Sequence, residues 1–200
     1  MRNYWRLLVL VVTISLAPAT KAEEITNTII WENSSSWLKL NKGVEFRVKI
    51  LDSVKNGCWT NAKTVKTAVE SVLKRSGYKI ADEAVTVTFQ IFLSSIGEEA
   101  GGGSCAVTYD LEVRWRGSDE FSSSGHKITA ITNTPLWEFN GILTGSKNEM
   151  NERLKEKYVD LAQSFLNDID VRRRAVLKEI SGSATLTPEA KAYWSNYKID

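Results

Sequence analysis

Apolar and polar residues alternate from position 44 to position 50, the pattern of a β-strand with one buried face. Its two faces carry different chemistry. The apolar set is Val44, Phe46, Val48 and Ile50, and the charged set is Glu45, Arg47 and Lys49. We therefore expect a half-buried strand here, with its apolar face on the core.

After position 61 the pattern changes to a helical period. Apolar residues recur at the i, i+3, i+4, i+7 and i+8 positions of one helix face, at Val65, Ala68, Val69, Val72 and Leu73. Thr60 or Asn61 is the predicted N-cap of this helix. Gly77 is predicted to end it in a left-handed conformation.

Two further alternating runs, residues 85–93 and 105–115, flank a glycine-rich link at residues 97–104. In the second run one face carries Cys105, Val107, Tyr109, Leu111, Val113 and Trp115, and the other carries Ala106, Thr108, Asp110, Glu112 and Arg114. These runs predict an antiparallel pair that is covered on one side only. A Ser- and Gly-rich turn at residues 122–125 precedes another expected strand, residues 127–132.

The C-terminal third is predicted to be helical. An irregular connection that contains Trp137 and Phe139 is expected to end at Gly145, and Ser146 with Glu149 has the spacing of a capping box. The buried stripe of the helix that follows is Met150, Leu154, Tyr158, Leu161, Ala162, Phe165, Leu166 and Ile169, and the helix is expected to continue toward Lys178. Thr187-Pro188-Glu189 predicts the start of a last short helix.

The order of these elements predicts an α+β fold. We expect a two-layer sandwich in which two main helices pack on one face of an antiparallel-dominated sheet. Residues 23–200 would form a single domain, with an N-terminal arm at 23–43 and an aromatic C-terminal tail at 183–200.

Residues 1–22 have the pattern of a signal peptide. Arg2 and Arg6 precede an apolar run from Leu7 to Leu16, and small residues up to Ala22 provide a cleavage site before Glu23. A run of this length is too short to cross a bilayer. We therefore expect cleavage and export, to a bacterial periplasm in preference or to the extracellular space.

Charge narrows the range of partners. Removal of residues 1–22 takes three basic residues from 26 and no acid from 24, so the mature chain has a net charge of about −1. This balance lacks the basic excess of nucleic-acid-binding proteins. We expect no nucleic-acid partner, no cofactor, no metal and no membrane span after cleavage.

Two cysteines, Cys58 and Cys105, lie in the mature chain. In an oxidising compartment such a pair is expected to form one disulfide that joins the entrance of the first helix to a strand. A metal-binding or redox pair is the alternative. The sequence has no CxxC spacing and one histidine, which disfavours it.

Motifs of catalysis are weak. Gly101-Gly102-Gly103 has no Gly-Lys-Ser/Thr after it and is preceded by Glu98 and Glu99, so we expect a loop and no phosphate site. His126, with Asp119, Glu120 and the serines at 122–124, could serve a hydrolase. Neighbours on an extended chain rarely converge into a site, and no Gly-x-Ser-x-Gly pattern is present.

Aromatic and basic residues in irregular or terminal segments are the remaining candidates. Large rings there need either a core to cover or a partner to bind. The candidate partner-binding residues are Trp31, Trp37, Trp137, Trp194, Tyr197, Arg172, Arg173 and Arg174. The three arginines could meet an acidic partner or lipid head group, but such a run is more often the charged end of a helix.

Taken together, these features favour an exported, non-enzymatic binding or assembly accessory protein whose partner is a protein or another envelope component. An exported hydrolase that uses His126 with nearby acids is one alternative. A secreted inhibitor or immunity-type protein is another, because it would bind its partner by the same physics.

Overall fold

The computed structural model describes residues 34–82, 88–123, 126–184 and 186–196. The predicted signal peptide, most of the predicted N-terminal arm, Trp31 and Tyr197 lie outside these residues. In chain order the elements are α1 (Ser34–Leu38), β1 (Glu45–Val54), α2 (Ala62–Arg75), β2 (Lys79–Ile80), β3 (Phe89–Gly101), β4 (Ser104–Ser123), β5 (His126–Ser146), α3 (Lys147–Gly182) and α4 (Pro188–Ser195).

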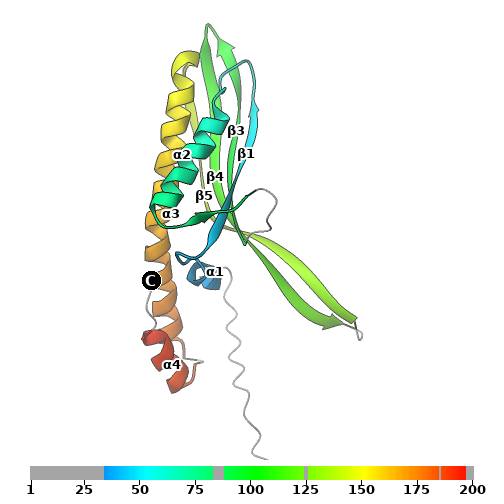
Figure 1. Cartoon of the computed structure of the whole chain (residues 1–200), viewed down its shortest axis with the longest axis vertical. Helices are drawn as coiled ribbons and strands as arrows, with labels where there is room; N and C mark the ends of the chain where they lie inside the picture. The colour runs from blue at the N-terminus through cyan, green and yellow to red at the C-terminus, as the bar shows by residue number, and fades with distance from the viewer. Residues whose placement is uncertain (1–33, 83–87, 124–125, 185, 197–200) are drawn as a thin grey trace, which may run out of the picture.

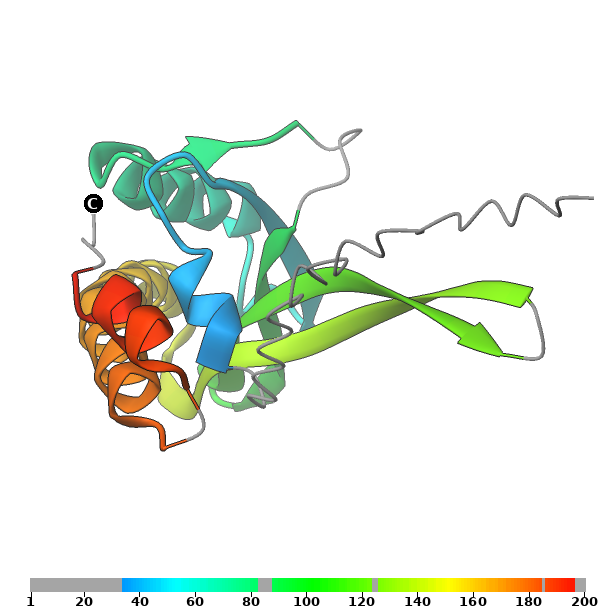
Figure 2. The same cartoon turned by 90° about the horizontal axis from the view of Figure 1, so that it is seen from below.

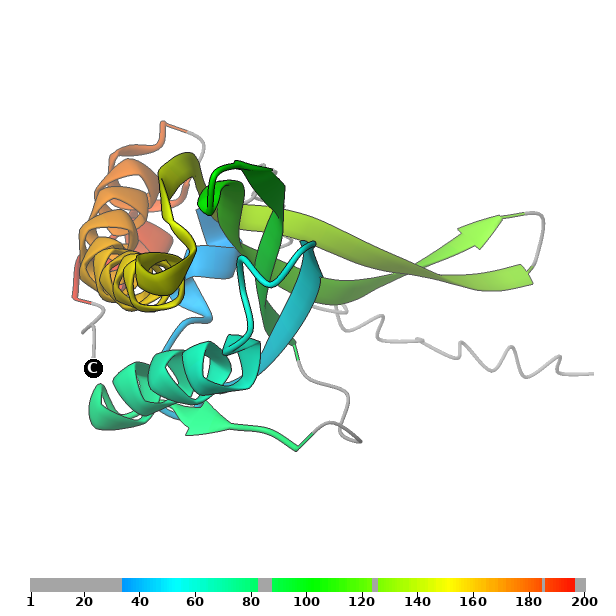
Figure 3. The ribbon, with the colours of Figure 1, turned by 90° about the horizontal axis from the view of Figure 1, so that it is seen from above.

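The strands form one five-stranded sheet in the order β2-β1-β3-β4-β5, and α2 and α3 lie side by side on one of its faces (Figures 1 and 3). This confirms the predicted α+β sandwich. Most of the ladder is antiparallel, between β3 and β4 and between β4 and β5. The pairs β1–β2 and β1–β3 are parallel because the chain crosses over through α2 between β1 and β3.

Between the layers lies the core that the patterns predicted. Phe46 of β1, Ile91 of β3 and Leu111 of β4 are fully buried, and so are Val65 of α2 and Tyr158 of α3. The stripe on α3 extends beyond the predicted set to Val176 and Ile180. No helix among the described residues is long and apolar enough to cross a membrane.

The helix ends agree with the predictions in part. Gly77 has φ +87° after α2, and the Thr187 side chain accepts a hydrogen bond from the Ala190 N–H at the start of α4. The prediction of a capping box at α3 is wrong, because the Ser146 side chain makes no cap hydrogen bond. The Lys147 N–H donates to the carbonyl of Gly103 instead, so the β3–β4 turn satisfies part of this helix end (2.9 Å).

Two predicted irregular segments are strand. β3 continues through most of the glycine-rich link, and the chain turns at Gly102 and Gly103, both with positive φ. β5 includes Trp137, Phe139 and Gly145, which were assigned to a connection. Long pairing with β4 imposes this structure, and glycine fits where a neighbour approaches closely. A Cβ on Gly141 would come within 2.7 Å of the Tyr109 ring.

A register shift lies between Val113 and Arg114 of β4, where the pairing on β5 moves from Trp137 to Pro135. Bulges of this kind bend a strand and increase its twist. Beyond this point β4 and β5 leave the sheet as a two-stranded arm, paired from Arg116–Asn133 to Ser123–His126 (Figures 1 and 2).

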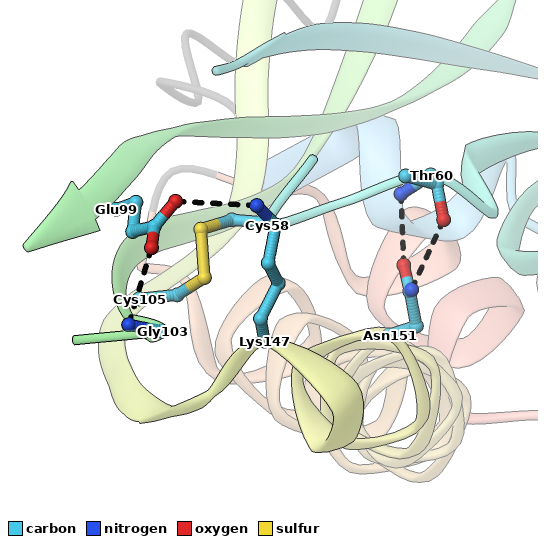
Figure 4. Close-up of a disulfide and its surroundings, with 7 residues drawn as sticks. All are labelled: Cys58, Thr60, Glu99, Gly103, Cys105, Lys147 and Asn151. Carbon is cyan, nitrogen blue, oxygen red and sulfur yellow. Dashed lines mark hydrogen bonds and ion pairs between the residues drawn. A yellow bond between two sulfur atoms is a disulfide. The ribbon is translucent and has the colours of Figure 1, made fainter. Parts of the chain in front are cut away.

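The predicted disulfide joins Cys58 to Cys105, whose Cα atoms are 5.8 Å apart (Figure 4). Both cysteines are buried, and no free cysteine remains in the described chain. Polar contacts surround the bridge: Asn151 on α3 bonds to the Thr60 backbone N–H and hydroxyl. The bridge thus fixes the entrance of α2 to the sheet.

Candidate functional site

In Figure 3 the described helices α2 and α3 lie on one face of the sheet, and no described helix lies over the opposite face. On this opposite face the register places Ile96 of β3, Thr108 of β4 and Ile142 of β5 in one row across three strands. Ile96 is 64% exposed and Ile142 is 70% exposed. Two large apolar side chains therefore lie on β3 and β5, one on each side of Thr108 of β4, with their surfaces open to solvent.

A groove of about 400 Å³ follows this row. Ser94, Asp110 and Asn140 form the next row across the same strands, so polar side chains line the groove beside Ile96 and Ile142. The alternation of residues 105–115 placed Asp110 on this face, but the isoleucines were not predicted. Local sequence gave no signal for them, because Ile96 precedes the glycine-rich link and Ile142 lies between Gly141 and Leu143.

Asp110 is one of the two carboxyl groups that line this groove. The Ser94 hydroxyl donates to its Oδ2 (3.1 Å), while its Oδ1 is shielded from solvent and has no hydrogen-bond partner among the described residues. Burial raises the pKa of Asp110 above its ordinary value, and the nearby Glu138 and Glu112 carboxylates raise it further. The Ser94 hydrogen bond acts in the opposite direction.

Two cationic side chains lie over the ring of Phe92 on β3. Arg114 forms an ion pair with Glu112 (2.6 Å) and lies over the ring of Phe92, 4.9 Å from the ring centroid. The Nζ of Lys49 lies 5.3 Å from the centroid of the same ring. Together with Asp110 and Glu138, these side chains surround the exposed isoleucines on one side with mostly acidic groups.

These residues have the chemistry of a binding surface. No group of three or more His, Cys, Asp or Glu side chains among the described residues could hold a metal ion. The groove contains carboxyl, amide and hydroxyl groups and no imidazole or thiol. It offers apolar contact and hydrogen-bond acceptors to a ligand.

The predicted aromatic candidates lie elsewhere. Trp37 is 6% exposed and packs on Phe165 of α3, with ring centroids 6.3 Å apart. Trp137 also contacts Phe165, and its indole N–H donates to Asp168 (2.9 Å). Trp194 of α4 is partly buried against the core. The rings of Trp37 and Trp137 therefore cover the core, which is one of the two roles that the sequence allowed.

Because α3 is helical, its three consecutive arginines point in different directions and differ in exposure. Arg173 is 2% exposed and belongs to the buried stripe, whereas Arg172 and Arg174 are exposed. The charge of Arg173 lowers the pKa of Tyr78, against the larger upward effect of burial and the effect of Asp170. Of the three arginines, Arg172 and Arg174 are the two that are exposed on this helix.

His126 is the first residue of β5, opposite Ser123 on the arm. Asp119 and Glu120 pair with Ala130 and Thr129 on the same two-stranded ribbon. The side chains of His126, Asp119 and Glu120 lie outside the description. The hydrolase alternative stays a prediction.

No family model matches the chain, and no curated protein matches it. Among solved structures, the chain is similar to a PelC dodecamer from Paraburkholderia phytofirmans at 13% sequence identity and a TM-score of 0.38, with 60% of this chain and 87% of that chain covered. It is also similar to a crystal structure of an uncharacterized protein at 13% identity and a TM-score of 0.33, with 66% and 95% covered. At these TM-scores neither likeness carries an argument.

Proposed function

We propose that this chain is an exported, non-enzymatic binding module that holds a protein partner on the open face of its sheet. One observation carries the proposal: Ile96 and Ile142 stand 64% and 70% exposed in one row beside a groove, on a face that no described helix covers (Figure 3). Contiguous exposed apolar surface rimmed by polar groups is typical of an interaction site.

Two features support export: the pattern of the N-terminal residues and the disulfide. Arg2, Arg6 and the apolar run from Leu7 to Leu16 have the signal-peptide pattern. The Cys58–Cys105 disulfide is suited to an oxidising compartment such as the periplasm or the extracellular space.

The groove also indicates the chemistry of the partner. Ile96 and Ile142 are the exposed apolar residues of its lining, and Asp110 and Glu138 form an acidic rim beside them. A complementary surface would present apolar side chains with lysine or arginine around them. Such a partner would pair with the acidic rim and exclude water from the isoleucines.

The test is capture of partners from the envelope fraction of the source cells by the immobilised mature chain. Ile96→Ser with Ile142→Ser should reduce capture of a specific protein at least about 10-fold, because truncated anchors lose most binding energy. Val171→Ser is the matched control, since Val171 is 57% exposed on α3, away from this face. Thermal melts of each variant would verify folding.

Equal capture by the isoleucine variant and the Val171 control would contradict the proposal. His126→Ala should leave capture unchanged, because His126 begins β5 on the arm and Ile142 lies near the other end of that strand. Loss of the biological activity in a folded His126→Ala protein would instead favour the hydrolase alternative.

A further inference from the structure

β1 is paired along only part of its outer edge. β2 meets it at Glu45 and Phe46, where the Ala81 N–H donates to the Phe46 carbonyl (2.9 Å). Successive residues of a strand direct their backbone groups to opposite edges, so Val48 and Ile50 direct theirs to this outer edge as well. In the part of the chain that the structure describes, no backbone group bonds to them.

A groove of about 850 Å³ runs beside this edge, between β1 and α2. Its apolar lining includes Val48, Ile50 and Ala62. In Figure 3, α2 lies alongside β1 at the margin of the sheet. A strand that extended the line of β2 would therefore place alternate side chains on this apolar lining, and the others on the open face.

The groove is strongly cationic. Arg47 and Lys49 of β1 and Lys63 and Lys66 of α2 line it, against a single acid, Glu70. Lys66 lies 3.9 Å from that acid. The Nε of Arg47 is shielded from solvent and has no hydrogen-bond partner among the described residues. This concentration of positive charge stands out in a mature chain whose net charge is about −1.

We propose that the outer edge of β1 binds an extended acidic segment of another protein as an added strand. The segment would alternate acidic residues, which meet Arg47 and Lys49, with apolar residues, which meet Val48 and Ile50. Main-chain hydrogen bonds to β1 give affinity in this mode of recognition, and the alternate side chains give specificity. This groove shares no lining residue with the groove at Asp110, although Lys49 also lies over the Phe92 ring on the open face.

Charge disfavours a second copy of the chain as the occupant. Two β1 edges in antiparallel contact would bring Arg47 and Lys49 of each copy onto the same face, where like charges repel. Lysine on an edge strand also serves to prevent such pairing. Protection alone does not require the cations of α2, which face the groove from the other side.

The probe is a fluorescent peptide of eight residues that alternates glutamate and valine, titrated with the oxidised mature chain at pH 7 and low salt. We expect saturable binding that weakens with salt. Lys49→Glu with Lys63→Glu should weaken it at least 10-fold. Lys157→Glu with Lys178→Glu is the matched control of equal charge change, since both lysines are exposed on α3, and it should stay within about 2-fold.

Two further probes separate strand addition from charge attraction. A lysine–valine peptide should not bind, and a glutamate–proline peptide should bind at least 10-fold more weakly, because proline lacks the backbone N–H. On binding of the glutamate–valine peptide, the Val48 and Ile50 amides should become protected from hydrogen exchange.

Absence of binding, equal binding by the Lys49/Lys63 variant, or equal binding of the proline peptide would each overturn the proposal. So would dimerisation of the chain through this edge in sedimentation. Ile96→Ser with Ile142→Ser should leave the peptide affinity unchanged, so failure here is distinguishable from failure of the open-face site.

Discussion

Replacing Cys58 and Cys105 together with alanine should lower the free energy of unfolding by about 3 to 4 kcal/mol at 25 °C. The bridge spans a sequence separation of 47 residues. In the chain-entropy model, a closed loop of this size restricts the unfolded chain by about 4 kcal/mol. In the native state Asn151 still holds Thr60 when the bridge is absent, so most of the loss comes from the unfolded state.

The measurement is urea denaturation followed by tryptophan fluorescence, with the wild type in oxidised and reduced forms beside the double variant. The midpoint should fall by roughly 2 M, and the reduced wild type should match the variant. Thr60→Val is a local control, because it removes one hydrogen bond at the same place and should cost only about 1 kcal/mol. A loss below about 1 kcal/mol for the cysteine variant would refute the reasoning.

Three further changes test individual residues. Tyr158→Phe should lower stability by about 1 to 3 kcal/mol in urea denaturation, because the buried hydroxyl bonds to Ser94 O (2.6 Å) and lies 2.8 Å from the Ser95 hydroxyl; an unchanged midpoint would contradict this. Asp110→Asn should stabilise the protein at pH 7 by less than about 1 kcal/mol. The pKa of Asp110 is raised in the folded protein, so its contribution to stability is complete below the unfolded pKa and is lost as pH rises through the folded pKa. That gain should disappear in melts below about pH 4, and a gain that persists there would have another cause. Trp37→Ala should cost about 3 to 5 kcal/mol because the ring is buried on Phe165, and a variant that melts like the wild type would place Trp37 outside the core.

Local patterns were sufficient where burial alone decides structure. The alternation at β1 and the stripe of α2 each reflect one buried face, and Gly77 ends α2 because its φ is positive. The sequence also located the disulfide, since two cysteines allow one intramolecular pairing.

Pairing between distant segments was beyond those patterns. Gly97 and Gly141 interrupt the alternation, yet both lie inside strands. Gly97 of β3 pairs with one edge of β4, and Gly141 of β5 pairs with the other. The parallel contact of β1 with β3 depends on the crossover through α2, which no local pattern records. Both grooves are lined by residues from segments that are distant in the sequence. The sequence therefore showed that residues such as Lys49 are charged, but it did not show which other residues lie beside them.

The length of the arm formed by β4 and β5 can be changed without altering the core of the protein. From Gly117 to Ser123, β4 pairs with β5 and with no other described strand, outside the layers that hold the core (Figure 1). Removing two residues from each strand would shorten the arm by about 7 Å and keep every remaining side chain on its original face. Removing a single residue from one strand would reverse the faces beyond that point. Length variants in steps of two could therefore measure how far the arm tip must stand from the domain.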